Sequence, residues 1–235
     1  MTTLGVIGDV HMELSVLDVV LAWLAARPLD GVLLVGDLAN GGHVRRPRPV
    51  EDWRWDAHQV IARVAQLGVP VLAVPGNHDL PALEHPGDVD GRVGVIGALR
   101  VGGLGGAGPA RFGFPYEWSE ADAAARLGQL PEVDVLLSHT PPWHRRDRTR
   151  RGAHVGSKSV LHWAATHAGF LACGHIHEDG GCDREGDCLV LNAGGLGQPF
   201  GLAQVGLIER EPGVDRVSWR CLDDGRAMEH ERRTG

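Results

Sequence analysis

Short apolar runs alternate with longer amphipathic stretches along most of the chain. The apolar runs typical of buried strands lie at 4–8, 31–36, 71–74, 133–138 and 170–174. The amphipathic stretches predict helices at 15–27, 56–68, 119–127 and 157–168. This alternation constrains the fold more than any other feature, because it favours an α/β protein with a mostly parallel central sheet.

The first two expected helices carry recognisable capping residues. Ser15 begins the first helix and Asp18 follows three residues later, which is a capping-box arrangement. Asp56 is the expected N-cap of the second helix, and Gly68 is its expected stop. These residues set the boundaries that we expect for both helices.

Two regions break the alternation. Residues 92–118 contain short apolar segments that are typical of hairpin strands, and residues 187–220 contain consecutive strand-like segments. A second sheet, rich in antiparallel pairs, is therefore expected. We expect a single domain over residues 1–222, followed by a polar and frayed tail at 223–235.

Charge and composition limit the classes of partner. The formal net charge of −7 argues against nucleic acid or an anionic membrane as a partner. No apolar run approaches the ~18 residues of a membrane span, and the N-terminal stretch does not resemble a signal peptide. The four cysteines match no zinc-ribbon spacing, so we expect reduced thiols in a cytoplasmic protein.

Polar side chains able to bind metal follow each of the five expected core strands. In open α/β sheets a ligand site lies outside the carboxyl ends of the strands, so these side chains are expected to converge on one edge. Most of them stand directly behind a glycine or a serine. They are Asp9 and His11, Asp37, Asn77 with His78 beside it, His139, and His175 with His177.

The chemistry of this set points to two metal ions. It contains more nitrogen and oxygen ligands than one ion can use, and two ions can share a carboxylate. Imidazoles favour Mn, Fe, Zn or Ni over Mg or Ca. Two dications, two carboxylates and a bridging hydroxide leave a formal charge of about +1, which suits an anionic phosphate ester.

Five motifs in order resemble the calcineurin-like metallophosphoesterase superfamily. They are "GDVH" (8–11), "GD" (36–37), "GNHD" (76–79), "SH" (138–139) and "GHIH" (174–177). The longer segments "SHTPPW" and "LNAGG" resemble the small bacterial and archaeal predicted phosphoesterases related to cyclic-nucleotide phosphodiesterases. The resemblance implies two packed mixed β-sheets flanked by helices, in a four-layer α/β/β/α sandwich.

The resemblance also implies a role for each motif residue. One ion is held by the residues matching Asp9, His11, Asp37 and His177, and the other by those matching Asp37, Asn77, His139 and His175. A metal-bridging hydroxide then attacks phosphorus. His78 matches the family's catalytic histidine, and Asp79 either orients that imidazole or caps the turn. Asn192 in "LNAGG" is interpreted as a structural turn residue.

The implied activity is hydrolysis of a small, nucleotide-like phosphodiester. A phosphomonoesterase or nucleotidase, a nuclease, and a catalytically inactive metal-binding interaction module are the alternatives. The stretch "GDLANGG" lacks the arginine of the serine/threonine phosphatases, and Asn40 stands where purple acid phosphatases carry a tyrosine. Neither of those subfamilies fits the chain.

Two basic loops follow strands on the expected metal side. We predict that some of their arginines contact the substrate phosphate, since a guanidinium group matches phosphate in a fork; solvated loops are the alternative. Aromatic residues could also wall the pocket, although core packing is their more common use. The arginines are Arg45, Arg46, Arg145, Arg146 and Arg148, and the aromatics are Phe112, Phe114, Tyr116, Trp118 and Trp143.

Overall fold

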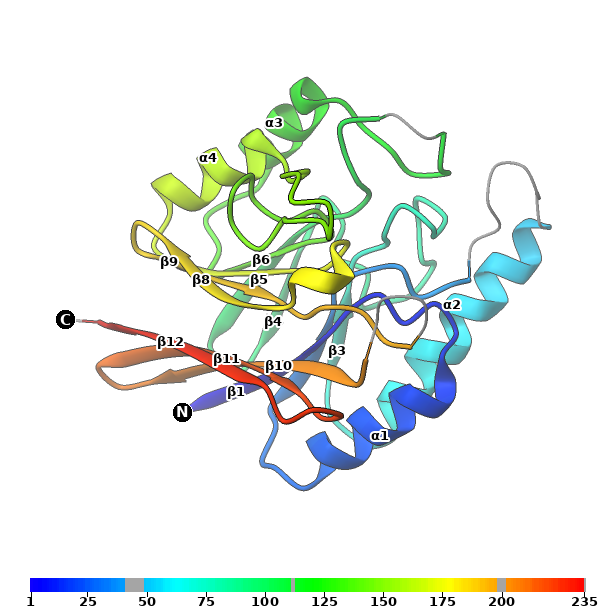
Figure 1. Cartoon of the computed structure of the whole chain (residues 1–235), viewed down its shortest axis with the longest axis horizontal. Helices are drawn as coiled ribbons and strands as arrows, with labels where there is room; N and C mark the ends of the chain where they lie inside the picture. The colour runs from blue at the N-terminus through cyan, green and yellow to red at the C-terminus, as the bar shows by residue number, and fades with distance from the viewer. Residues whose placement is uncertain (41–48, 111–112, 198–201, 235) are drawn as a thin grey trace.

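The computed structural model describes residues 1–40, 49–110, 113–197 and 202–234 (Figure 1). The predictions for Arg45, Arg46 and Phe112 lie outside these residues. The N-terminal half contains β1 (Thr2–Ile7), α1 (Leu14–Ala25), β2 (Gly31–Leu34), α2 (Val50–Val64), a short 3-10 helix (Ala65–Leu67), β3 (Val71–Ala73), β4 (Val93–Ile96) and β5 (Leu99–Leu104). The C-terminal half contains α3 (Glu120–Gln129), β6 (Val135–Ser138), α4 (Lys158–Thr166), β7 (Gly169–Cys173), a 3-10 turn (His177–Asp179), β8 (Gly181–Glu185), β9 (Cys188–Asn192), β10 (Gln204–Glu211), β11 (Val214–Cys221) and β12 (Ala227–Arg233).

The strands form two six-stranded mixed sheets. The first has the order β12-β11-β10-β1-β2-β3, and the second has the order β4-β5-β6-β7-β9-β8. In the first sheet β1, β2 and β3 are parallel, whereas β10 joins β1 in antiparallel register. In the second sheet β5, β6, β7 and β9 are parallel, with β4 and β8 antiparallel at the two edges.

Both faces of the central strands are buried, and alternate residues along such a strand point to different layers. In β2, Leu33 packs between the two sheets, whereas Val32 and Leu34 pack against the first pair of helices. In β7, Phe170 lies between the sheets and Leu171 faces the second pair. The continuous apolar runs of the sequence follow from this double burial.

The helices cover the two outer faces of the sheet pair (Figure 1). Helices α1 and α2 pack on the first sheet through one core, and α3 and α4 pack on the second sheet through another. The expected four-layer α/β/β/α sandwich is therefore confirmed. No helix in the described part of the chain is long and apolar enough to cross a membrane.

The prediction of one central sheet that carries all five motif strands is wrong. Strands β1, β2 and β3 belong to the first sheet, and β6 and β7 belong to the second. A parallel strand with both faces buried looks the same in sequence whichever sheet it joins. The motifs still meet, because the carboxyl ends of the two packed sheets lie at the same end of the sandwich.

The first two helices begin earlier than their expected caps. Helix α1 begins at Leu14, so Ser15 lies inside it, and Asp18 forms an ion pair with Arg63 of α2 at 2.5 Å. Helix α2 begins at Val50, which leaves Asp56 buried within the helix. Its carboxylate accepts a hydrogen bond from the backbone N–H of Asn40. In the folded chain these carboxylates therefore make tertiary contacts instead of capping the helices.

The last two helices begin as expected. Ser119 and Asp122 form a complete capping box at the start of α3. Ser157 caps α4, where its hydroxyl accepts a hydrogen bond from the N–H of Val160. Both caps matter for the site, because the N-termini of α3 and α4 lie beside the cavity described below.

Two other expectations differ from the structure. Residues 113–118 form no strand, and their one bridge joins Glu117 to Ala107. The tail is not frayed over most of its length, since β12 pairs with β11 from Ala227 to Arg233. Its polar composition reflects an edge strand whose side chains are mostly exposed, rather than an unstructured segment.

Candidate metal centre

The expected ligands lie in the turns that follow five strands of the two sheets. Asp9 and His11 follow β1, Asp37 follows β2, and Asn77 follows β3. From the second sheet, His139 follows β6, and His175 and His177 follow β7. Asp9, Asp37, Asn77 and His139 are almost fully buried. The chain thus brings polar groups together at an end of the sandwich where water has little access.

Several of these residues adopt left-handed backbone conformations. The φ angles are 49° at Asp9, 45° at His11, 50° at Asp37 and 66° at His175. Non-glycine residues adopt positive φ infrequently, and such strain tends to collect at functional sites. The strained backbone of these turns therefore directs the side chains toward the centre. Nothing in the sequence indicated this strain.

The glycines before the ligands make room for neighbouring ligands. A Cβ atom on Gly76 would lie 2.1 Å from the Asp37 carboxylate, and one on Gly174 would lie 2.2 Å from that of Asp9. Any larger residue at either position would push a carboxylate out of place. Gly76 therefore allows the turns after β2 and β3 to approach closely, and Gly174 does the same for the turns after β1 and β7, which belong to different sheets.

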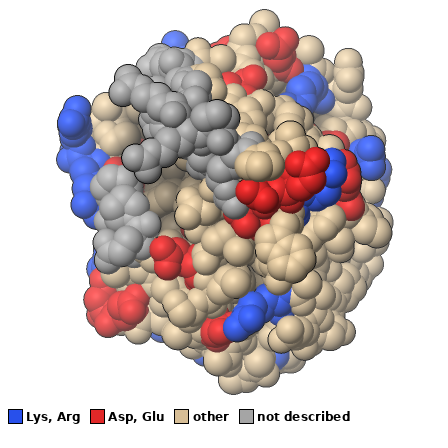
Figure 2. Space-filling view, turned by 90° about the vertical axis from the view of Figure 1, so that its right-hand side faces the viewer, with Lys and Arg blue, Asp and Glu red and all other residues tan. Residues whose placement is uncertain are grey.

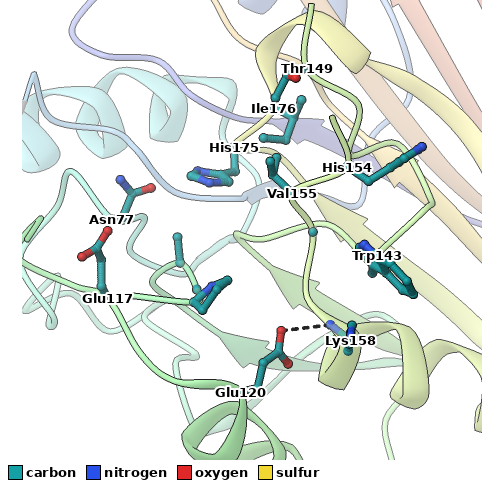
Figure 3. Close-up of a pocket in the computed structure, with 14 residues that line it drawn as sticks. Asn77, Glu117, Glu120, Trp143, Thr149, His154, Val155, Lys158, His175 and Ile176 are labelled. Atoms are coloured by element: carbon teal, nitrogen blue, oxygen red, sulfur yellow. Dashed lines mark hydrogen bonds between the residues drawn. The ribbon is translucent and has the colours of Figure 1, made fainter. Parts of the chain in front are cut away.

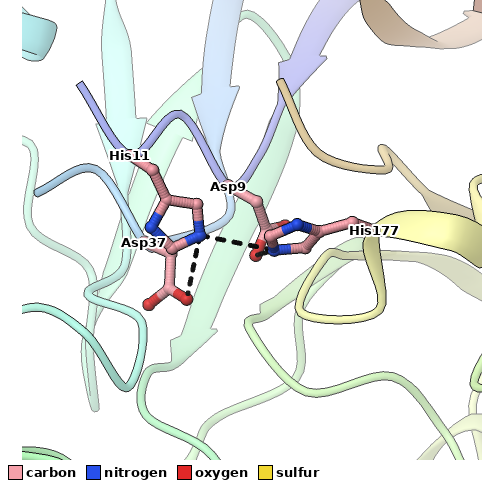
Figure 4. Close-up of side chains that lie close together, drawn as sticks. All are labelled: Asp9, His11, Asp37 and His177. Atoms are coloured by element: carbon pink, nitrogen blue, oxygen red, sulfur yellow. Dashed lines mark hydrogen bonds and ion pairs between the residues drawn. The ribbon is translucent and has the colours of Figure 1, made fainter. Parts of the chain in front are cut away.

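The first cluster contains Asp9, His11, Asp37 and His177, whose ligand atoms all lie within 4.8 Å of one another (Figure 4). The Nε2 atoms of His11 and His177 are 3.3 Å apart. His177 Nε2 lies 3.1 Å from Asp9 Oδ1, and His11 Nε2 lies 3.6 Å from Asp37 Oδ2. Two imidazoles and two carboxylates converging in this way fit a divalent transition metal ion.

The second cluster contains Asp37, His139 and His175. His139 Nδ1 lies 2.8 Å from the carbonyl oxygen of Val35 and must donate to it, because a carbonyl only accepts. The lone pair of a neutral His139 is therefore on Nε2, 3.0 Å from Asn77 Oδ1 and 3.5 Å from Asp37 Oδ2. Lone pairs that face each other in a buried site fit a cation between them.

Burial and mutual attraction shift the pKa values of these groups strongly. Burial alone would lower the pKa of His139, but the Asp37 carboxylate outweighs it and raises the pKa to about 9. Burial and the neighbouring His139 lower the pKa of His175 to about 3. Burial would raise the pKa of Asp37, yet the surrounding histidines, His139 first, hold it well below its usual range. The carboxylates therefore draw positive charge into the site.

His78 belongs to neither ligand cluster. Its backbone N–H donates to Asp37 Oδ1 at 2.8 Å, which ties the turn after β3 to the turn after β2. Its ring lies 5.2 Å from the His11 ring and 4.3 Å from the Phe114 ring, measured between centroids. The imidazole thus lies beside the first cluster, packed against an aromatic side chain.

Asp79 also connects the turn after β3 to the turn after β2. Its buried carboxylate accepts hydrogen bonds from the backbone N–H groups of Ala39 and Gly76 at 2.8 Å and of Leu38 at 3.1 Å. Burial and repulsion by Asp37 raise its pKa to about 6. Of the two roles expected for Asp79, orienting the His78 imidazole or capping the turn, these backbone contacts support capping.

Asn192 holds other loops in place, in agreement with its interpretation as a turn residue. Its amide nitrogen donates to the carbonyl oxygens of Arg146 and Ile176, and its Oδ1 accepts from the N–H of Gly194. The asparagine therefore connects the "LNAGG" turn to the loop after β6 and to the His177 turn.

The arginines of the second basic loop are not brought to the centre. Arg145 pairs with Glu185 at 2.8 Å, and Arg146 lies 3.7 Å from Asp179. The backbone N–H of Arg148 donates to the same Asp179 carboxylate. None of the three lines the cavity described next. Their carboxylate partners lie 30 to 40 positions away in the sequence, and no local pattern connects them.

A cavity of about 480 Å³ opens beside the second cluster (Figure 3). Asn77 and His175 form its inner end, and Trp143 lies at its far side. Of the four candidate aromatics that the structure describes, Trp143 is therefore the one that lines this cavity, whereas Trp118 packs in the core and Phe114 contacts His78. The cavity is also lined by Glu117, Glu120 and Lys158, which no motif in the sequence pointed to.

A family model described as the calcineurin-like phosphoesterase superfamily domain matches residues 2–210. The chain belongs to the calcineurin-like phosphoesterase superfamily. The resemblance drawn from the five motifs is thereby confirmed, and the chain is a member of a family of metal-dependent hydrolases of phosphoesters.

Two curated proteins resemble this superfamily member in sequence. An uncharacterized protein of Methanocaldococcus jannaschii is 30% identical over 57% of this chain and 69% of its own length. A probable cyclic nucleotide phosphodiesterase of Synechococcus is 29% identical over 51% of this chain and 45% of its own length. The match thus spans less than half of the second relative.

Solved structures resemble the whole phosphoesterase chain in fold. A dimetal phosphatase from Danio rerio superposes with a TM-score of 0.64 at 15% identity, covering 100% of this chain and 99% of the other. A Thermus thermophilus protein gives a TM-score of 0.61 at 18% identity, covering 97% and 98%. At these identities the likeness shows the fold alone.

Proposed function

We propose that the protein is a two-metal phosphodiesterase that acts on a small, nucleotide-like diester. One ion would be held by Asp9, His11, Asp37 and His177, and a second by Asp37, Asn77, His139 and His175. The observation that carries this proposal is the position of Asp37, whose carboxylate belongs to both ligand clusters. A carboxylate shared by both clusters supports a pair of neighbouring ions rather than two separate sites.

The proposed ligands support Mn, Fe, Zn or Ni as the ions, because more than half of the ligand side chains are imidazoles. When bound, two such ions would offset the charge of the phosphate and lower the pKa of a water molecule. The buried carboxylates and the hydrogen bond from His139 to Val35 keep the ligands oriented before any ion arrives.

The hydrolysis needs a proton at the leaving oxygen, and we assign its delivery to His78. The attacking water gives up one proton to bulk water and its oxygen bonds to phosphorus, the bond from phosphorus to the leaving oxygen breaks, and a ring nitrogen of His78 gives that leaving oxygen its proton. Contact with Phe114 and the His11 ring holds the imidazole beside the first cluster. Asp79 acts as a positioning residue, because it fixes the turn that carries His78.

A diester is favoured over a monoester by the cavity beside the second cluster, which offers about 480 Å³ for a second ester group. The face shown in Figure 2 carries both acidic and basic side chains. That mixture and the net charge of −7 do not favour a nucleic-acid track. The four cysteines are free and buried, and we propose a cytoplasmic location.

The test combines metal content with substrate preference. The Mn-loaded protein should contain two ions per chain and should hydrolyse bis-p-nitrophenyl phosphate with a higher kcat/KM than p-nitrophenyl phosphate. Preference for the monoester would favour a phosphomonoesterase or nucleotidase instead. Two bound ions without hydrolysis of either ester would support the interaction module.

A further inference from the structure

The first cluster takes its ligands from both sheets. Three of them stand on turns of the first sheet, whereas His177 stands on the turn after β7 of the second sheet. Figure 4 shows His177 reaching the cluster from the opposite side to His11. The position of His177 relative to the other three ligands therefore depends on how the two sheets are held together at this end.

The turn that carries His177 is short. It is a 3-10 segment of three residues, His177–Asp179. Such segments have poorer hydrogen-bond geometry than an α-helix and are seldom long enough to be rigid by themselves. The orientation of the His177 ring therefore depends on contacts with other segments of the chain.

Gln204 supplies such a contact from the first sheet. It is the first residue of β10, and it is almost fully buried. Its amide nitrogen donates to the carbonyl oxygen of His177 at 3.1 Å and to that of Gly195 at 3.0 Å. A buried amide that donates to two separate turns holds those turns at a fixed distance from each other.

The second of these turns, residues 194–196, lies against the ligands. A Cβ atom on Gly195 would lie 2.6 Å from Cγ of His177, so this glycine lets the turn pack directly on the imidazole. The next residue, Leu196, donates its backbone N–H to the carbonyl oxygen of Asp9 at 3.0 Å. The 194–196 turn thus contacts two residues of the first cluster, and Gln204 fixes that turn in place.

Two glycines make room for the Gln204 amide. A Cβ atom on Gly194 would lie 2.2 Å from Oε1 of Gln204, and one on Gly180 would lie 2.3 Å from the same atom. Gly194 also has a φ angle of 73°, which glycine adopts more readily than any other residue. The two turns are therefore shaped around this one side chain, as a positioning role requires.

The second cluster has a different connection between the sheets. His139 of the second sheet donates from Nδ1 to the carbonyl oxygen of Val35, which directly follows β2 of the first sheet. The amide nitrogen of Gln204 bonds instead to the turns around His177. Each cluster is thus connected across the sheets by its own hydrogen bonds, so one connection can be removed while the other stays.

We propose that Gln204 is a positioning residue for the first metal ion, because it holds the His177 turn against the 194–196 turn and thereby sets the affinity of the first cluster but not of the second. The inference rests on the proposed pair of ions and adds a residue that acts on one of them. Residues that orient metal ligands typically contribute about 10- to 100-fold to metal affinity. No motif pointed to Gln204, which lies 27 positions from His177 in the sequence.

The first experiment measures Mn affinity after the amide is removed. Gln204→Met keeps the length of the side chain without an N–H donor, and Gln204→Glu keeps its shape but places an oxygen against both carbonyl oxygens. In equilibrium dialysis against Mn, one of the two ions should bind about 10- to 100-fold more weakly to Gln204→Met and more weakly still to Gln204→Glu. The other ion should change little. Unchanged affinity for both ions in both variants would overturn the role of Gln204.

Ligand variants then identify the ion that is affected. His139→Ala should keep only the first ion, and His11→Ala should keep only the second. Adding Gln204→Met should weaken the ion that His139→Ala keeps and should not affect the one that His11→Ala keeps. Equal weakening of both ions would mean that Gln204 supports the fold in general, which contradicts the inference.

Two control variants separate positioning from general destabilisation. Gln66→Met makes the same chemical change at an exposed position of the 3-10 helix after α2, and it should leave both affinities unchanged. Val217→Ala creates space in the core between the sheets, so it should lower stability without changing Mn binding. If Mn affinity falls as far in Val217→Ala as in Gln204→Met, lost stability alone explains the effect and the inference is wrong.

A measurement without metal or substrate distinguishes this inference from the proposed activity. In NMR spectra of the metal-free protein, Gln204→Met should shift or broaden the ring signals of His177 and leave those of His139 in place. Unchanged His177 signals would overturn the positioning role even if the protein hydrolyses diesters. If Gln204→Met weakens one ion selectively but no ester is hydrolysed, the proposed activity fails and the role of Gln204 stands.

Discussion

The buried carboxylates of β11 and of the metal centre differ in their partners. Asp215 on β11 is fully buried and accepts both side-on hydrogen bonds from Arg210, while Arg232 forms a second ion pair with it. Asp9 and Asp37 are buried to the same degree, yet their side-chain partners are imidazoles. The first arrangement carries permanent positive charge, and the second does not.

This difference separates a structural ion-pair network from a binding site. The guanidinium groups around Asp215 are charged at every relevant pH, so the protein balances that carboxylate by itself. At the metal centre, balance requires either protonated histidines or cations from solution. Burying carboxylates among neutral imidazoles is costly unless a cation completes the site. The metal centre therefore needs positive charge from bound cations or protons, whereas the guanidinium groups around Asp215 supply it permanently.

Replacing Asp37 gives the largest expected effect and tests the sharing directly. Asp37→Asn removes the one carboxylate common to both clusters, so both ions should be lost together and kcat/KM should fall by about 10⁴-fold or more. Metal analysis at matched free Mn concentrations measures the first effect. Loss of only one ion per chain would show that Asp37 does not bridge.

His78→Ala asks whether this histidine belongs with the ligands or apart from them. We expect two ions to remain bound and kcat to fall by about 10²–10⁴-fold, because the leaving oxygen loses its proton donor. Metal content and turnover are measured on the same sample. A parallel fall in metal content would mean that His78 is a ligand. Diesters with p-nitrophenolate should be less affected than diesters with alkoxide leaving groups, since they need the proton less.

Asp215→Asn should produce the opposite pattern. Removing one partner of a buried ion pair leaves guanidinium charge uncompensated, and we expect a loss of about 3 kcal/mol in the free energy of unfolding. The number of bound Mn ions per folded chain should stay unchanged. Urea unfolding and metal analysis together give both quantities. A folded Asp215→Asn protein that binds fewer ions would break the distinction between the two regions.

The sequence predicted which polar side chains would lie close together, because each follows an apolar strand and the carboxyl ends of such strands meet. The structure brings six of the seven into two clusters that share Asp37, and the seventh, Asn77, lies beside His139. The sequence did not reveal that these strands divide between two sheets. Apolar runs encode burial on both faces but not the identity of the neighbouring strand.

Contacts between distant segments account for the other differences. Asp18 and Asp56 were expected to cap helices. Instead, Asp18 forms an ion pair with Arg63, and Asp56 accepts a hydrogen bond from the backbone N–H of Asn40. Arg145 was expected near substrate, yet Glu185 of β8 neutralises it. In each of these cases a plausible local role was overridden by a partner far away in the chain, which local pattern reasoning cannot see.

Glu120 is a third kind of carboxylate and gives the smallest expected effect. Within the described part of the chain, its hydrogen-bond donors are the N–H and hydroxyl groups at the start of α4, rather than arginines or imidazoles. Burial would raise its pKa, but the hydrogen bonds from Ser159, Lys158 and Ser157 outweigh burial and lower it below its usual value of 4.5. A carboxyl group with a lowered pKa in the folded state stabilises the fold above its unfolded pKa. That stabilisation is lost as the pH falls through the folded pKa.

We therefore expect Glu120→Gln to lower the free energy of unfolding by about 1 kcal/mol at pH 7, since the amide cannot accept all of these hydrogen bonds. The difference from the unmodified protein should shrink as the pH falls from about 5 to about 3, where Glu120 itself becomes protonated. Glu132→Gln, at an exposed position before β6, is the matched control and should show little change at either pH. Urea unfolding at several pH values measures the trend. A difference that stays constant with pH would mean that the charge of Glu120 does not matter, and that shape alone explains its contacts with α4.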